Sequence, residues 1–329
     1  MRSRLATSST LATLSTLATL SALACLPLAG CFVPKDATPQ LALGVDLDSK
    51  FVHRGQTMVD KPVLRPSMSA SLPTTLGGDL GGTVEANMDL VENTGNAWFP
   101  SGHSGKFTQI ELIGDYTQTF GEVTMRAGIH SYNLPNGLEF KNGERGGTTE
   151  AFTTFSANVL EATPYLSLHY DFDEVRAGYW RAGLTESFDL GEGFSLTGDG
   201  SLGYAASSQS AWIYGIDEAG FADLRGRLQL DYLVDERTTI SAAINGSTIV
   251  DGTIADWLDQ IGIHSDVIWF SVGVGWSFLS RLTSRGSAGT RRDRSRPAAS
   301  ATRARRPARR LRATAGVSAR CPSCSRCAW

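Results

Sequence analysis

The stretch VIWFSVGVGWSF, residues 267–278, alternates between two kinds of side chain. Every second residue from Ile268 to Phe278 is apolar, and most positions between them are small or polar. A period of two predicts a β-strand with one apolar face. The apolar row closes on Trp276 and Phe278, although some fifty more residues follow.

The same alternation recurs through the preceding chain and predicts about twelve strands. The predicted strands fall at 41–54, 63–72, 83–90, 109–116, 122–132, 149–160, 165–172, 176–190, 194–205, 223–234, 238–249 and 267–278. Turn-rich pieces such as PNGLEFKNGERGG join them.

Half-apolar strands suit either a β-sandwich, with the apolar face inside, or a transmembrane barrel, with that face toward lipid. Three features favour the barrel: strands of ten or more residues, an even strand count and many charges on the polar rows. Aromatic residues near the predicted strand ends fit a membrane-interface belt. These aromatics are Tyr116, Phe120, Trp180, Trp212 and Trp276. We therefore predict an all-β protein, a transmembrane antiparallel up-and-down β-barrel over residues 41–278, in the outer membrane of a bacterium.

The N-terminus predicts export. Residues 1–30 have two arginines, then a run rich in Leu, Ala, Ser and Thr, as in a secretory signal peptide. Residues 28–31 read LAGC, which resembles a lipobox and predicts lipidation of Cys31; the alternative is an ordinary signal peptide that ends near a cysteine. Residues 31–40 form a short polar linker. Residues 32–278 contain no cysteine, which excludes a disulfide framework there.

Opposite charges separate the barrel region from the C-terminal tail. Residues 279–329 hold fourteen Arg, no Lys and one Asp, so the net charge of -3 conceals about +13 in the tail and about -16 before it. An acidic barrel argues against nucleic acid as a partner. We interpret the tail as disordered, with a composition typical of GC-rich DNA translated in the wrong frame; the alternative is a basic arm for anionic lipid or polymer.

Two segments carry a family resemblance. Residues 51–72, FVHRGQTMVDKPVLRPSMSASL, with their Arg54-Gly55 corner, resemble the start of TorF-type porins, and residues 149–190 resemble the central strand pairs of such barrels. The final strand, with Trp276 and Phe278, looks like the terminal strand that the barrel-insertion machinery reads. The resemblance covers residues 41–278 and implies a porin. A lipobox, and a chain that continues beyond the terminal Phe, depart from the family pattern.

The sequence gives only weak support for a catalytic site or a metal site. Cys321, Cys324 and Cys327 have the spacing of zinc ligands but no fourth partner nearby. Ser167 and His169 on one polar row, with His130 on another, resemble parts of a hydrolase site, a pattern that polar rows also produce by chance. We expect no enzyme activity, no cofactor and no metal.

The polar rows predict a lumen of mixed charge, and together with the resemblance they indicate a porin for passive diffusion of small solutes. The acidic excess of the barrel region, which we expect in loops and turns, predicts at most a weak preference for cations. The predicted pore-lining residues are Asp46, Asp48, Lys50, Arg65, Glu85, Asp89, Glu111, Arg126, Asp171, Arg181, Arg225, Arg227 and Asp231. The alternatives are a non-conducting structural or surface-binding lipoprotein barrel and, less favoured, a lipid hydrolase. Expected partners are outer-membrane lipid, the insertion machinery and small solutes; the sequence leaves the oligomeric state open.

Overall fold

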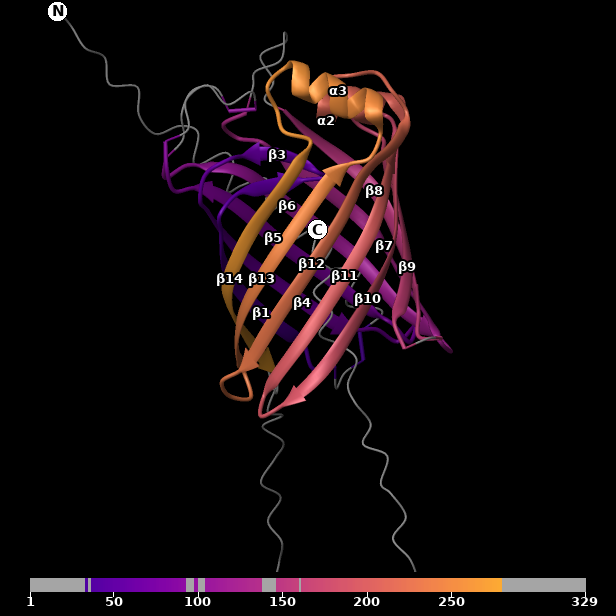
Figure 1. Ribbon diagram of the computed structural model, residues 1–329. Helices are drawn as coiled ribbons and strands as arrows, with labels where there is room; N and C mark the ends of the chain where they lie inside the picture. The colour runs from indigo at the N-terminus through magenta and orange to yellow at the C-terminus, as the bar shows by residue number, and fades with distance from the viewer. Residues whose placement is uncertain are drawn as a thin grey trace, which may run out of the picture. The chain divides into compact units, whose positions relative to one another are not determined.

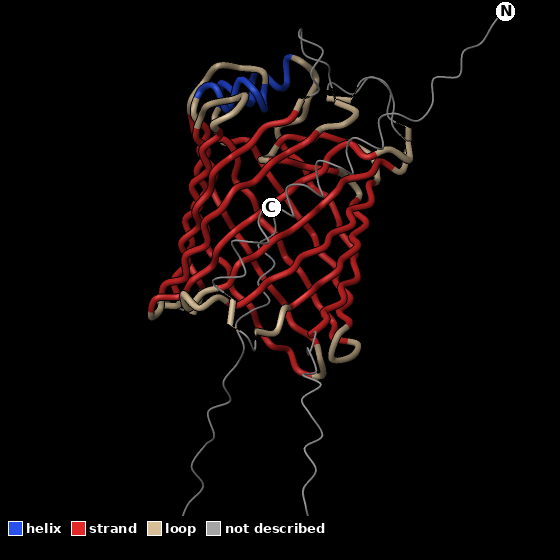
Figure 2. Tube along the Cα trace, turned by 180° about the vertical axis from the view of Figure 1, so that it is seen from behind, coloured by secondary structure: helices blue, strands red, loops and turns tan. Residues whose placement is uncertain are grey.

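A computed structural model describes residues 33–34, 37–92, 98–99, 104–137, 146–159 and 161–279. Twelve antiparallel strands close into a barrel in the order β1-β14-β13-β12-β11-β10-β9-β8-β7-β6-β5-β4 (Figures 1 and 2). Consecutive wall strands are neighbours, so the predicted up-and-down barrel is confirmed. The first and last strands close it, pairing from Gln40–Leu279 to Asp48–Ser271.

The wall strands are nine to fourteen residues long, as a tilted strand needs to cross a bilayer. They are β1 (Gln40–Asp48), β4 (Val63–Pro73), β5 (Asp79–Asp89), β6 (Phe107–Phe120), β7 (Val123–Asn133), β8 (Gly147–Ala157), β9 (Thr163–Asp171), β10 (Gly178–Gly191), β11 (Phe194–Ala205), β12 (Gly220–Leu233), β13 (Thr238–Ile249) and β14 (Asp266–Leu279).

The predicted first strand, 41–54, is too long. The chain leaves the wall after Asp48 and forms a separate two-stranded hairpin from β2 (Phe51–His53) and β3 (Gln56–Val59). Phe51, Met58 and Val59 are buried in a small apolar cluster. The apolar residues that read as a continuing strand therefore anchor the hairpin instead.

The two ends of the barrel differ. Short turns join β4 to β5, β6 to β7, β8 to β9, β10 to β11 and β12 to β13 at the turn end. The opposite, loop end carries the β2–β3 hairpin and two short helices, α2 (Ser207–Tyr214) and α3 (Gly252–Gln260), which lie side by side (Figure 1). No helix among the described residues is long and apolar enough to cross a membrane.

An apolar cluster fixes the helices to the rim. Ile213 and Tyr214 of α2 and Ile254 and Leu258 of α3 are buried against Tyr179 on β10, among other wall residues. The Asp251 carboxylate caps α3 by accepting the backbone N–H groups of its first turn. The loop end of the barrel is therefore a packed cap.

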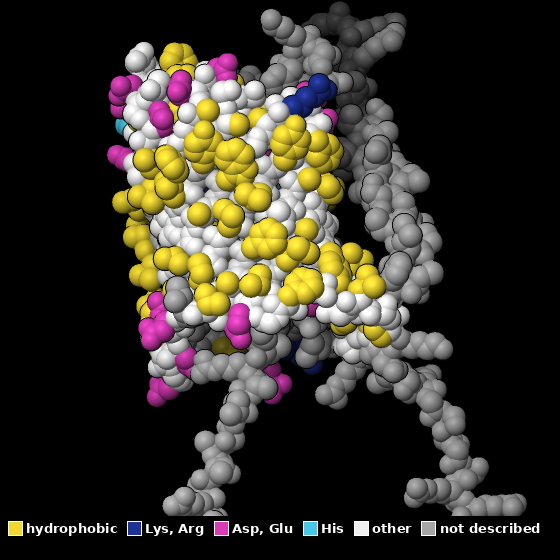
Figure 3. All heavy atoms as spheres, turned by 90° about the vertical axis from the view of Figure 1, so that its right-hand side faces the viewer, with side chains coloured by type: hydrophobic (Ala, Val, Ile, Leu, Met, Phe, Trp, Pro, Cys, Tyr) yellow, Lys and Arg dark blue, Asp and Glu magenta, His cyan; other side chains and the backbone are white. Residues whose placement is uncertain are grey.

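The outer surface of the wall is apolar. In Figure 3 hydrophobic side chains spread over the wall, and Asp and Glu side chains gather near its two ends. Exposed aromatics lie near both ends, among them Phe120 and Phe188 at the turn end and Tyr170, Trp180 and Phe221 at the loop end. These positions are those of the aromatic girdles of outer-membrane barrels.

The aromatic belt does not include Trp212. This residue lies in α2, where its ring meets the Trp98 ring edge-on at 5.8 Å. The remaining exterior pattern is that of a membrane barrel, and a sheet pairs every backbone group within lipid only when it is closed. The protein is thus built as an outer-membrane barrel, in agreement with the predicted location.

Candidate functional site in the barrel lumen

The β2–β3 hairpin reaches across the lumen at the loop end. Its tip, Arg54-Gly55, has φ angles of 47° and 81°. A Cβ atom on Gly55 would lie 2.7 Å from Asp223 Cβ and 2.9 Å from Ile249 Cδ1, so the tip touches the wall at β12 and β13. Only glycine fits this close approach with a left-handed backbone.

An ion pair ties the tip to the wall strand β8. The Arg54 Nη2 group donates to both oxygens of Glu150, at 2.7 and 2.6 Å, and only 3% and 2% of the two side chains are exposed. The Arg54 guanidinium also lies 4.2 Å from the centroid of the Tyr179 ring. Burial alone would lower the pKa of Arg54, but the Glu150 carboxylate outweighs it and the pKa is raised. The pair is therefore ionised.

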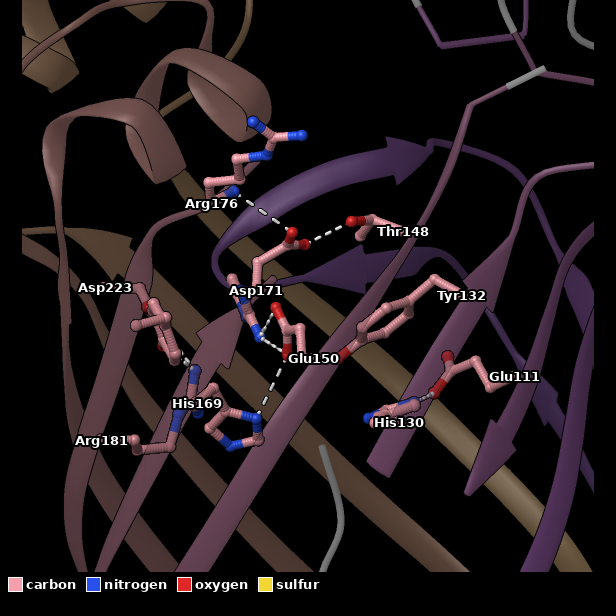
Figure 4. Close-up of polar contacts among 12 residues, drawn as sticks. Glu111, His130, Tyr132, Thr148, Glu150, His169, Asp171, Arg176, Arg181 and Asp223 are labelled. Atoms are coloured by element: carbon pink, nitrogen blue, oxygen red, sulfur yellow. Dashed lines mark hydrogen bonds and ion pairs between the residues drawn. The ribbon is translucent and has the colours of Figure 1, made fainter. Parts of the chain in front are cut away.

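Other polar side chains complete the shell around Glu150. The Tyr132 hydroxyl donates to Glu150 at 3.2 Å, and His169 Nδ1 lies 3.2 Å from the same carboxylate (Figure 4). We call Arg54, Glu150, Tyr132 and His169 the latch. It combines one residue of the hairpin with three residues from β7, β8 and β9.

His53 precedes the tip and meets the Tyr132 ring edge-on at 5.5 Å. Burial, then the positive charge of Arg54, lowers the pKa of His53 to about 3, against the attraction of Glu111 and Glu150. The imidazole is therefore neutral at pH 7 while the hairpin is docked.

Further polar pairs follow the inner face of the wall. His130 Nε2 lies 2.8 Å from Glu111, which also accepts from Gln109 at 2.6 Å (Figure 4). On β10 and β12, Arg181 donates to Asp223 at 2.7 Å, and the Tyr179 hydroxyl donates to the other oxygen of Asp223 at 2.6 Å. These pairs lie on strands whose opposite rows face outward and are apolar.

Most predicted pore-lining residues take part in such contacts. Arg65 bridges Asp48 and Glu85 at 3.3 Å each, Arg126 pairs with Asp115 at 2.7 Å, and Arg227 donates to Gln229, which donates to Asp231. Asp89 accepts from Thr108 at 3.0 Å. Asp46 packs beside Gly273, where a Cβ would clash with its carboxylate. That these residues line a conducting pore stays a prediction.

Two predicted lining residues have local roles. Lys50 lies in the turn between β1 and β2 and pairs with Asp60 at 2.5 Å. Asp171 accepts from the Thr148 hydroxyl and from three backbone N–H groups of the β9–β10 turn, including that of Arg176 (Figure 4). Asp171 therefore stabilises that turn.

The predicted lining does not include four lumen carboxylates or the arginine of the latch, which the sequence singled out only as part of the Arg54-Gly55 corner. These residues are Arg54, Asp115, Glu150, Asp199 and Asp223. Asp115 stood on a recognised polar row. Glu150 lies in GTTEAFTTFSA, where threonines and phenylalanines blur the alternation.

The residues considered for hydrolysis belong to the wall network. The Ser167 hydroxyl hydrogen-bonds to that of Thr154 at 2.8 Å, while His169 faces Glu150 and His130 faces Glu111. Within the described ranges no cluster of His, Cys, Asp and Glu suits a metal ion. Cys31 and residues 280–329, with their three cysteines, lie outside the described residues.

The terminal residues of the predicted insertion signal lie on β14. Trp276 pairs with Leu43 of β1 and with Thr238 of β13, and Phe278 pairs with Leu41. Phe278 is exposed on the outer row at the turn end. Both residues therefore belong to the seam that closes the barrel.

No protein-family model and no curated protein sequence matches this chain. Solved porins and channels match its fold. An outer-membrane channel from Pseudomonas putida F1 matches with 12% identity and a TM-score of 0.46, over 75% of this chain and 97% of that one. The NanC porin matches with 11% identity and a TM-score of 0.43, over 71% of this chain and 98% of that one. The KdgM porin in complex with disordered oligogalacturonate matches with 10% identity and a TM-score of 0.40, over 73% of this chain and 99% of that one. The strands and surfaces described above, and not these matches, make this chain a twelve-stranded barrel of the outer-membrane type.

Proposed function

We propose that the protein is an outer-membrane channel for small solutes, narrowed at its loop end by the β2–β3 hairpin. The supporting observation is the contrast between the two faces of the wall. Outward rows such as that of β14 are apolar and exposed, whereas inward rows carry charged and polar side chains on strand after strand. A charged inner surface within an apolar shell is how porins hold water across a membrane.

The charge of the lumen supports a weak preference for cations. The lumen residues outside the predicted lining are four carboxylates against one arginine. The lumen therefore holds more carboxylates than basic groups, which favours the passage of cations, although ion pairs neutralise much of this negative charge locally. The preference falls with salt, because the Debye length shrinks from about 30 Å at 0.01 M to about 3 Å at 1 M.

Conductance across a planar bilayer tests the proposal. We expect discrete channels from the purified chain, and a reversal potential in a potassium chloride gradient that favours potassium at low salt and approaches zero selectivity at 1 M. A strong anion preference at all salt concentrations, or no conductance, contradicts the channel.

A non-conducting barrel is the second candidate, and the packed loop end favours it. The hairpin, the latch and the charged residues Asp171 and Asp223 leave little exposed side-chain surface there; both carboxylates are 0% exposed. Absence of conductance in the native chain, together with conductance after the latch is broken, would assign the hairpin as a plug.

The remaining expectations concern location and partners. We propose membership of the TorF-type porins, lipidation of Cys31, insertion by the machinery that reads Trp276 and Phe278, and contact with outer-membrane lipid. Mass spectrometry of the mature N-terminal peptide tests the lipid: diacylglycerol on Cys31 is expected, and a free N-terminus downstream of it contradicts the lipobox.

A further inference from the structure

Two lumen arginines differ from the others. Arg54, Arg65, Arg126 and Arg181 each pair with a carboxylate at 3.3 Å or less. Arg225 and Arg227, two residues apart on the inward row of β12, form no ion pair with any residue that the structure describes. An enclosed cation without a counter-charge is costly, and proteins usually place an anion beside it.

The surroundings of Arg225 hold it in place without neutralising it. Its guanidinium lies 5.4 Å from the centroid of the Trp269 ring, and the residue is 8% exposed. Its direct neighbours across the ladder are Ser201 on β11 and Ser247 on β13. None of these contacts supplies a negative charge. Two carboxylates lie close along the ladder, Asp223 on the same row and Asp199 opposite Arg227, but Asp223 accepts from Arg181 and Tyr179, and Asp199 accepts from Tyr165. Arg227 lies next along the row and adds its own positive charge.

Two polar atoms beside the arginines have no hydrogen-bond partner among the described residues. They are Ser247 Oγ and Asn245 Oδ1, on residues that are 7% and 1% exposed. Asn245 is the ladder partner of both Arg227 and Trp269, and Ser247 is that of Arg225. A Cβ on Gly55 would lie 3.3 Å from Ser247 Oγ, which places the hairpin tip at the edge of this cluster.

We infer that Arg225, Arg227, Asn245, Ser247 and Trp269 form a binding site for the carboxylate of a small hydroxy acid. Two planar guanidinium groups match a planar carboxylate, and the Ser247 hydroxyl supplies a further donor. Asn245 Oδ1, which can only accept, fits a hydroxyl group adjacent to that carboxylate. As a station for a passing solute the site rests on the proposed function, whereas the binding itself does not require conduction.

Equilibrium titration of the full chain in detergent tests the site, with lactate as the probe and propionate as its analogue without the hydroxyl. We expect saturable lactate binding, and binding about tenfold to a hundredfold weaker in Arg225→Gln, because a charge-assisted hydrogen bond is lost. Arg237→Gln is the control: it removes the same charge from the exposed β12–β13 turn at the opposite end of the barrel and should bind like the native chain. Arg227→Gln, at a less buried position, serves if Arg225→Gln fails to fold, as judged by gel migration before and after boiling.

The outcomes separate this site from the channel. Weaker propionate binding supports the role of Asn245, whereas equal affinity for the two acids overturns the hydroxy-acid class. Inorganic phosphate that binds more tightly than lactate overturns the carboxylate assignment. No saturable binding in the native chain, or an equal loss in Arg237→Gln, overturns the site, even if the barrel conducts. Lactate binding without conductance supports the binding site and contradicts the channel.

Discussion

Glu150→Gln should release the β2–β3 hairpin from the lumen. The substitution keeps the shape of the side chain but leaves the Arg54 guanidinium, whose side chain is 3% exposed, without its counter-charge. Removal of one partner of a buried ion pair costs about 3–5 kcal/mol. The docking equilibrium should therefore shift by about two to three and a half orders of magnitude toward the released hairpin.

Limited trypsin digestion measures this shift directly, because the latch arginine is itself a cleavage site. While the hairpin is docked, the buried Arg54-Gly55 bond is protected, and cleavage follows the population of the open form when reclosing is fast. We expect cleavage at this bond to become about a hundredfold faster in Glu150→Gln, measured by mass spectrometry of the fragments.

Asp60→Asn provides the matched control. It breaks the Lys50–Asp60 pair at the base of the same hairpin, where the side chains are 33% and 61% exposed. Exposed pairs contribute at most about 1 kcal/mol, so cleavage should accelerate no more than about fivefold. A double variant, Arg54→Met with Glu150→Leu, should keep the hairpin docked, as followed by hydrogen exchange of residues 51–59. Equal cleavage rates in Glu150→Gln and Asp60→Asn would refute the latch.

Three further predictions concern the hairpin and the wall. Acidification should loosen the hairpin, because the pKa of His53 is about 3 when the hairpin is docked and near 6.5 when it is released. Docking should weaken as the pH falls below 6.5, by about 2 kcal/mol at pH 5. Hydrogen exchange of residues 51–59 measures this effect, which should vanish in His53→Gln. Gly55→Ala should expose the Arg54-Gly55 bond to trypsin, since the added Cβ meets Asp223 at 2.7 Å; unchanged protection would argue against the close contact between tip and wall. Leu228→Arg, on the lipid face, should lower the free energy of unfolding in lipid vesicles by about 2–4 kcal/mol, whereas Gln229→Arg on the lumen face should cost much less; equal losses would contradict the assignment of faces.

The wall was predictable because lipid imposes a simple rule on it. Each outward residue meets hydrocarbon, so Ile268, Phe270 and Val272 must all be apolar, while their neighbours are free to be small or polar. That contrast survives in nearly every strand and gives both the strand number and the face that each residue occupies.

The hairpin was hidden for a physical reason. Phe51, Met58 and Val59 carry the apolar character of a strand, but they pack against a local cluster instead of lipid. The pairing that docks the tip joins Arg54 to Glu150, 96 residues away, and no local pattern contains it. The two arms of the hairpin thus read as wall and loop.

Helix α3 left a clearer trace. Ile254, Trp257 and Leu258 have helical spacing, and Asp251 stands at the position of a helix cap. We predicted no element between the strands 238–249 and 267–278, because the segment from Asp251 to Asp259 has only nine residues and three of them are carboxylates. Its stability comes from the rim against which it packs, since isolated helices of this length are marginal.

The seam between β1 and β14 has a kinetic consequence. Because the earliest and latest strands of the wall must meet, every partly assembled sheet presents two raw edges that can recruit other chains. Contacts this distant along the chain form late, after the entropy of a very large loop has been lost. The hairpin tip touches β8, β12 and β13 at once, so it finds its place only after the cylinder is complete. The time at which Arg54 becomes resistant to trypsin would then report when the barrel closes and its last free strand edge is paired.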